Sequence, residues 1–124
     1  MAKMVQTDKA PAAIGPYSQA VVTGNLVFTS GQIPINPETG SVDANDITAQ
    51  TEQVMQNLAE VLTAAGSSFE KAVKTTCFLS DIDNFAAFNE VYAKYFTGKP
   101  ARSCVAVKDL PRGVLVEVEV IAEI

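Results

Sequence analysis

Residues 72–107 read AVKTTCFLSDIDNFAAFNEVYAKYFTGKPARSCVAV, and this stretch decides the fold class of the 124-residue chain. Residues 72–79 are rich in β-branched and aromatic side chains, which is typical of a strand. Residues 102–107 predict a second strand, and the segment between the two predicts a helix. A helix placed between two strands predicts a crossover connection and therefore a mixed sheet with helices on one face.

Alternation along the strand 72–79 places four side chains on one face: Val73, Thr75, Cys77 and Leu79. The helix that follows is predicted to start from a cap at Asp81 or Asp83, to run to about Phe96 and to end at Gly98. Its apolar stripe at helical spacing comprises Phe85, Phe88, Tyr92 and Phe96. Asn89 falls at the edge of this stripe, where the pattern predicts an apolar residue.

The flanking segments complete an α+β architecture. Residues 18–30 predict a hairpin around Gly24-Asn25, an order that suits a type II′ turn better than type I′. Residues 32–45 form a loop with a turn at 37–40, residues 3–6 predict a short strand, and residues 114–123 predict the last one. A turn containing Pro111 and Gly113 joins that last strand to the one at 102–107. We therefore expect one domain over 1–124, with a mixed β-sheet of about six strands and two α-helices packed on one face.

The first of these two helices is predicted to begin at an Asp46 cap and to end at Gly66. Its apolar residues recur at helical spacing and should face the sheet. Its polar residues are expected to face solvent: Gln50, Gln53, Gln56, Asn57 and Glu60.

Composition excludes several classes of function. The chain has no histidine, which removes Ser/His/Asp and Cys/His nucleophilic chemistry and the usual His-ligated metal sites. The glycine spacing excludes phosphate-cradling loops, and no lysine stands in a Schiff-base setting, so neither an organic cofactor nor a metal is expected. A net charge of -5 disfavours nucleic acid as a partner. No apolar run is long enough for a membrane span or a signal peptide, so a cytoplasmic location is expected.

Arg102 is the first candidate for a functional residue. It enters an apolar strand directly after Pro100-Ala101, and its guanidinium must find an anion because it cannot lose its charge. A bound carboxylate would meet this need through a bidentate contact. An ion pair with Glu117 or Glu119 across two adjacent strands would meet it equally well.

Glu117 and Glu119 share one face of the last strand, where they either face water or act as a general acid or base in a partly dry cleft. Tyr17 follows a rigid segment with two prolines and a glycine, which is either a connector or a support for a ligand site. The Ser30-Gly31 pair allows close approach of backbone atoms. Cys77 and Cys104 are expected to be free thiols in a reducing compartment.

Five segments, in order along nearly the whole chain, resemble the RidA (YjgF/YER057c/UK114) family. They are Ala13-Ile14-Gly15-Pro16-Tyr17-Ser18-Gln19-Ala20, Thr29-Ser30-Gly31-Gln32-Ile33-Pro34, Phe88-Asn89-Glu90-Val91-Tyr92, Pro100-Ala101-Arg102-Ser103-Cys104-Val105, and Leu110-Pro111 through Glu117-Val118-Glu119-Val120-Ile121-Ala122. The resemblance implies a fold similar to Bacillus chorismate mutase, a homotrimer, and sites in the clefts between neighbouring subunits.

The activity that the resemblance implies is that of a 2-iminobutanoate/2-iminopropanoate deaminase. Such an enzyme hydrolyses reactive 2-imino acids, including the tautomer of 2-aminoacrylate, which pyridoxal-phosphate dehydratases release, to 2-keto acids and ammonia. By the same resemblance Arg102 would bind the substrate carboxylate with help from the Cys104 backbone, and Glu117 would orient and deprotonate the attacking water. The pocket would be lined by Tyr17, Ser30, Gly31 and Asn89, some of them from the neighbouring subunit.

Two other functions fit the same resemblance: a non-catalytic regulator that binds small keto or amino acids, and an RNA-cleaving inhibitor of translation. Arg102 together with Glu117 favours the enzyme, because a binder needs only the arginine. The acidic charge and the missing histidines disfavour RNA cleavage. The sequence departs from the common family pattern at Thr97-Gly98-Lys99, close to the expected pocket mouth, which affects the substrate preference.

Overall fold

The computed structural model describes residues 2–124, which form one six-stranded sheet and two α-helices. The strands are β1 (Lys3–Val5), β2 (Ala20–Thr23), β3 (Leu26–Thr29), β4 (Ala72–Leu79), β5 (Ala101–Ala106) and β6 (Val116–Glu123). Their order in the sheet is β1-β2-β3-β6-β4-β5. Only β4 and β5 run parallel, because the helix between them returns the chain to the same end of the sheet. The predicted α+β class and mixed sheet are confirmed.

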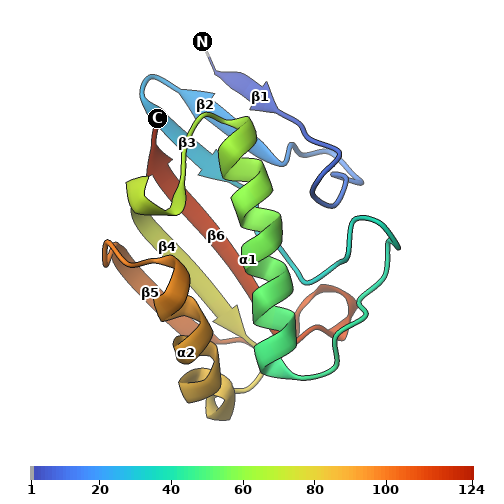
Figure 1. Cartoon of the computed structure of the whole chain (residues 1–124). Helices are drawn as coiled ribbons and strands as arrows, with labels where there is room; N and C mark the ends of the chain where they lie inside the picture. Colours follow the sequence, from blue (N-terminus) through green and yellow to red (C-terminus); the bar gives the residue numbers. More distant parts are fainter. Residues whose placement is uncertain (1) are drawn as a thin grey trace.

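Both helices, α1 (Ile47–Ala64) and α2 (Phe85–Tyr95), lie on the same face of the sheet (Figure 1). The Asp46 side chain caps α1 by accepting a hydrogen bond from the Ala49 amide at 2.8 Å. The buried face of α1 packs on alternate residues of the central strand β6, whose Val116, Val118 and Val120 are no more than 1% exposed. The core therefore lies between the helices and the middle of the sheet, and the other face of the sheet carries no helix.

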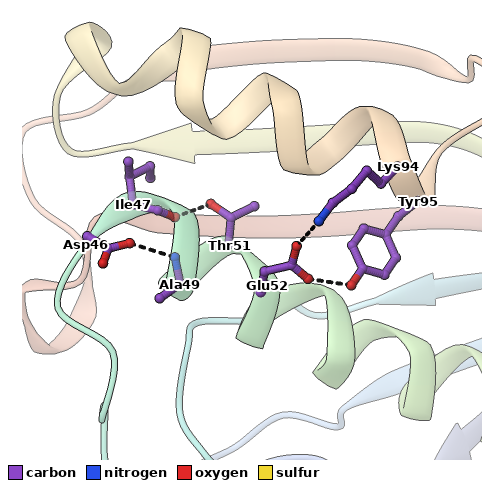
Figure 2. A network of polar contacts seen from close by, with 7 residues as sticks. All are labelled: Asp46, Ile47, Ala49, Thr51, Glu52, Lys94 and Tyr95. Carbon is purple, nitrogen blue, oxygen red and sulfur yellow. Dashed lines mark hydrogen bonds and ion pairs between the residues drawn. The ribbon is translucent and has the colours of Figure 1, made fainter.

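One polar group joins the two helices (Figure 2). The Glu52 carboxylate on α1 accepts a hydrogen bond from the Tyr95 hydroxyl at 2.5 Å and forms an ion pair with Lys94. These hydrogen bonds lower the pKa of Glu52, and the same carboxylate raises the pKa of Tyr95 to about 12. The contact fixes the C-terminal turn of α2 against α1.

The hairpin turn has the predicted type. Gly24 has a φ of +57°. The φ of Asn25 is not positive, which excludes a type I′ turn and agrees with type II′. Among residues 2–124, the only non-glycine residues with positive φ are Lys99 and Arg112. The helix α2 ends at Tyr95, one residue before the predicted end at about Phe96. A turn at 97–98 follows it, and Lys99 is the residue with positive φ before the chain enters β5.

The predicted adjacency of the last two strands is wrong. Strand β5 pairs with β4 at the edge of the sheet, and β4 separates it from β6. Nearness in sequence predicted a pairing that the crossover through α2 prevents. The predicted start of α2 also differs, because Asp81 caps a short 3-10 turn at Ile82–Asn84 that precedes the helix.

Two polar residues of α1 that were expected in solvent are buried. Asn57 is 1% exposed and its amide donates to the carbonyls of Ile33 and Ile35 at 3.2 and 3.0 Å. Gln50 is 5% exposed and its side-chain oxygen accepts from the Leu115 amide at 2.8 Å. A buried polar side chain needs such partners, and these two hold the loops on either side of the candidate site.

The strand 72–79 has the predicted bounds, with one error in its inward face. Thr75, Cys77 and Leu79 are fully buried, but Val73 is 45% exposed. A register shift between Ala72 and Lys74 displaces Val73 from the alternation.

Candidate active site

Arg102 lies on the helix-covered face of the edge strand β5, against α2. Its Nη1 donates a hydrogen bond to the Asn89 side-chain oxygen at 2.5 Å. The guanidinium carbon lies 4.7 Å from the centroid of the Tyr92 ring and 5.4 Å from that of Phe85. We call Arg102 and these three partners the arginine side of the site. All three partners are neutral, so they do not compensate the positive charge.

The predicted alternative for Arg102, an ion pair with Glu117 or Glu119, is wrong. Among residues 2–124 the ion pair between Lys94 and Glu52 is the only one. Arg102 is directly opposite Thr75 in the pairing of β5 with β4, and Thr75 is opposite Val120 of β6. Paired residues point to the same face, so Arg102 shares the face of the valines and not that of the glutamates.

Cys104 follows Arg102 by two positions on the same face and is directly opposite Cys77. Both are free thiols, as predicted. Burial raises the pKa of Cys77 to about 12 and also raises the pKa of Cys104. Neither thiol is therefore suited to act as a nucleophile at neutral pH.

Glu117 points to the opposite face of the sheet, the one without helices, and borders a cavity of about 400 Å³. Tyr17, Ser30 and Gly31 line the same cavity. Partial burial raises the pKa of Glu117, and the nearby charge of Glu119 adds to this effect. We call Glu117 and these three residues the glutamate side of the site. A carboxyl with a raised pKa in a partly dry cavity is suited to exchange a proton with a ligand or water.

Gly31 has a specific role in the cavity, because the carboxyl of Glu117 lies against its backbone. A Cβ at Gly31 would stand 2.8 Å from Cδ of Glu117, closer than real Cβ atoms pack, and at a tight 3.0 Å from Cγ. The bridge between Gln32 and Val118 brings the two residues together. A glycine at position 31 is therefore what allows Glu117 its present position.

The irregular segment before Tyr17 forms the outer rim of the cavity and is fixed by one buried amide. Gln19 is 3% exposed, and its side-chain oxygen accepts from the Thr7 amide at 2.7 Å. Its side-chain nitrogen donates to the carbonyls of Thr7 and Pro11 at 3.0 and 2.8 Å. Ser30 supports the same segment by donating its hydroxyl to the Ser18 carbonyl at 2.6 Å, and Tyr17 itself is 54% exposed.

The predicted site residues therefore form two groups within one chain. Asn89 and Cys104 lie with Arg102 on the helix-covered face, whereas Tyr17, Ser30 and Gly31 lie with Glu117 on the other. The residues that sequence reasoning missed are the supports: Phe85 and Tyr92 as partners of Arg102, and Gln19 behind the rim. The sequence signal for the first two was their spacing around Asn89 on one helix face.

The chain belongs to the RidA (YjgF) family, because the sequence model of the family described as Endoribonuclease L-PSP matches residues 7–124. The 2-iminobutanoate/2-iminopropanoate deaminase of Escherichia coli strain K12 is 48% identical to it over 126 residues, covering 98% of each chain.

Solved structures of family members have the same fold. The chain superposes with a TM-score of 0.97 on YyfA of Yersinia pestis, a protein of the conserved Rid family, at 50% identity and 100% coverage of both chains. With TdcF of Escherichia coli, solved with bound serine, the TM-score is 0.93 at 44% identity and 98% coverage of each chain. Neither helix of residues 2–124 is long and apolar enough to cross a membrane.

Proposed function

We propose that this protein is a cofactor-independent deaminase that hydrolyses 2-imino acids, 2-iminopropanoate and 2-iminobutanoate among them, to 2-keto acids and ammonia. The observation that carries the proposal is that the Arg102 guanidinium contacts only neutral groups. A guanidinium held only by an amide oxygen and two aromatic rings keeps its full charge for a ligand. A ligand carboxylate is the anion that its planar fork fits best. The deaminase name of the 48% identical relative supports the same substrate class.

Glu117 supplies the proton transfers in this proposal. Its ionised carboxylate takes a proton from water as the water oxygen bonds to the imine carbon, while the electron pair of the C=N bond moves to nitrogen. The resulting carbinolamine receives the proton on nitrogen from the Glu117 carboxyl. The Glu117 carboxylate then takes the hydroxyl proton as the C=O bond of the keto acid forms, and it returns this proton to the departing nitrogen, which leaves as ammonia. The raised pKa of Glu117 suits a group that must both take and return a proton near neutrality.

One chain cannot bring both groups to one small substrate, because they stand on opposite faces of the sheet. The proposal therefore places the active site between two copies of the chain, in the homotrimer that the family resemblance implies. The helix-free face of the sheet supports this arrangement. Met4, Phe28 and Val105 point to it and are 75%, 40% and 46% exposed. Exposed apolar side chains gathered on one face of a sheet favour contact with another chain.

The decisive experiment follows the release of 2-keto acid from a serine or threonine dehydratase, with and without this protein, while an amine traps the free imine. The wild type should accelerate release, and Arg102→Ala should lower kcat/KM about a hundredfold, as expected when one partner of a charged pair is removed. Arg112→Ala is the matched control, since the other arginine of the chain donates to the Gly40 carbonyl in a surface loop.

The result that would overturn the proposal is a wild type that binds 2-keto acids but leaves the release unchanged. The non-catalytic regulator would then be the better description. RNA cleavage that persists through stringent purification and is lost in Arg102→Ala would instead revive the third alternative.

A further inference from the structure

The aromatic partners of Arg102 come from one face of α2. Phe85, Asn89 and Tyr92 occupy positions i, i+4 and i+7, so their side chains follow one another along the helix. The Arg102 guanidinium lies against this row, with the amide of Asn89 as its hydrogen-bond acceptor and the two rings beside it. Contacts of a cation with ring faces at these distances are attractive.

Tyr92 is itself held from two directions. Its hydroxyl and that of Thr75 are 2.8 Å apart and hydrogen-bonded, with Thr75 fully buried. Its ring stacks on Phe96 at a centroid distance of 4.5 Å. Burial raises the pKa of the Tyr92 phenol, which keeps it neutral beside the guanidinium.

Thr75, which is hydrogen-bonded to the Tyr92 hydroxyl, lies on β4, the strand that pairs with β5. Thr75 is the register partner of Arg102, directly opposite it across the β4–β5 ladder. Arg102, Tyr92 and Thr75 therefore form a closed triangle: a backbone pairing, a hydroxyl hydrogen bond and a cation–ring contact. A triangle of this kind restricts the guanidinium to one orientation without placing a negative charge beside it.

We propose that Tyr92, anchored by Thr75, is a positioning residue that presents Arg102 to the carboxylate of the substrate. Phe85 contributes in the same way from a greater distance. The inference rests on the proposed function, because it assigns the aromatic contacts to recognition of the 2-imino acid carboxylate. Their contribution is to substrate affinity and not to the chemical step.

The test compares Tyr92→Leu, Tyr92→Phe and Thr75→Val in the dehydratase-coupled assay. Tyr92→Leu removes the ring and should raise KM about tenfold with kcat little changed. Tyr92→Phe and Thr75→Val each remove one end of the hydroxyl pair and should raise KM about threefold. The double variant should be no worse than either single one, because both remove the same contact.

Tyr95→Phe is the matched control on the same helix. It removes a tyrosine hydroxyl that is bonded to Glu52, away from Arg102, and should lower thermal stability without changing KM. If Tyr92→Leu fails to fold, the two conservative variants carry the test alone. An unchanged KM in both of them, or a fall in kcat with KM constant, would overturn the inference.

Direct binding separates this inference from the proposed function. Titration of each variant with 2-oxobutanoate and with 2-oxobutanamide measures affinity without turnover. The variants should bind the acid more weakly than the wild type does and bind the amide equally. A wild type without deaminase activity would refute the proposed function alone, whereas equal affinity of all variants for the acid would refute the role of Tyr92.

Discussion

The arginine side and the glutamate side place their charged groups in different ways. Arg102 is held by a helix, through neutral groups that fix its direction and leave its charge intact. Glu117 rests against a glycine backbone in an open cavity, where burial and Glu119 raise its pKa. A binding group needs a fixed orientation, whereas a group that exchanges protons needs an environment that brings its two protonation states close in energy.

The largest effect should come from Glu117→Gln, which keeps the shape of the glutamate side and removes its proton transfer. We expect kcat to fall about 10²–10⁴-fold. Binding of 2-oxobutanoate should persist, because Arg102 is untouched. Steady-state kinetics and ligand titration measure the two quantities separately, and an unchanged kcat would remove Glu117 from the mechanism.

The pH dependence of kcat/KM is a second test of Glu117 as the base. Glu117 must be ionised to act as a base, and its pKa is raised above the ordinary 4.5. The wild-type kcat/KM should therefore fall as the pH drops through a value above 4.5. Glu119→Gln removes one cause of the raised pKa, so it should keep activity and move this fall to lower pH. A profile that does not move would show that Glu119 has no influence on the base.

Coexpression of Arg102→Ala with Glu117→Gln tests whether the two sides meet across copies. Each variant alone should be inactive. In mixed trimers with random assembly, about a quarter of the sites combine an intact arginine with an intact glutamate, so about a quarter of the wild-type activity should return. No recovery in assemblies shown to be mixed by native mass spectrometry would show that Arg102 and Glu117 of different copies do not act on the same substrate.

A smaller loss is expected for Gly31→Ala, which displaces Glu117 without removing it. The added methyl group would overlap the Glu117 side chain, and a shift of about 1 Å can cost up to about a hundredfold in kcat. Gly98→Ala is the control for kcat, since its Cβ would meet its nearest neighbour, the Glu70 carbonyl, at an ordinary 3.6 Å. KM is left out of this comparison because Gly98 belongs to the segment expected at the pocket mouth. Equal kcat of the two variants would show that Gly31 does not position Glu117.

The smallest effect concerns stability outside the site. Tyr95→Phe should lower the free energy of unfolding by about 1 kcal/mol, since it removes one partly exposed hydrogen bond. The folded-state pKa of Tyr95 is about 12 against an ordinary 10, so the contribution is complete below pH 10 and is lost between pH 10 and 12. Urea unfolding at pH 8 and at pH 12 should show the difference only at pH 8; a difference that is the same at both would contradict it.

Local signals predicted the elements well because the responsible residues are close in sequence. The Asp46 cap fixed the start of α1, and the order Gly24-Asn25 fixed the turn type. Asn89 also stood out as the polar residue at the edge of the α2 stripe. Each of these depends on contacts within a few positions, where propensity and spacing are informative.

The relations between elements could not be predicted in the same way. The pairing of β5 with β4 depends on the crossover, and together with the register of β4 against β6 it puts Arg102 and Glu117 on opposite faces. Asn57 looked like a solvent residue because its acceptors, the carbonyls of Ile33 and Ile35, lie in a distant loop. Alternation also failed at Val73, because a bulge leaves no trace in the hydrophobic pattern.

The hydrogen bonds of the buried Gln19 side chain affect how the substrate range of such a protein can evolve. It holds the rim segment through main-chain groups of Thr7 and Pro11, and therefore places little demand on the side chains there. Mutations at Pro11 and Ala12 can change the wall of the cavity while the path of the backbone persists. These rim side chains can therefore change under selection for new substrates, whereas Gln19 itself cannot.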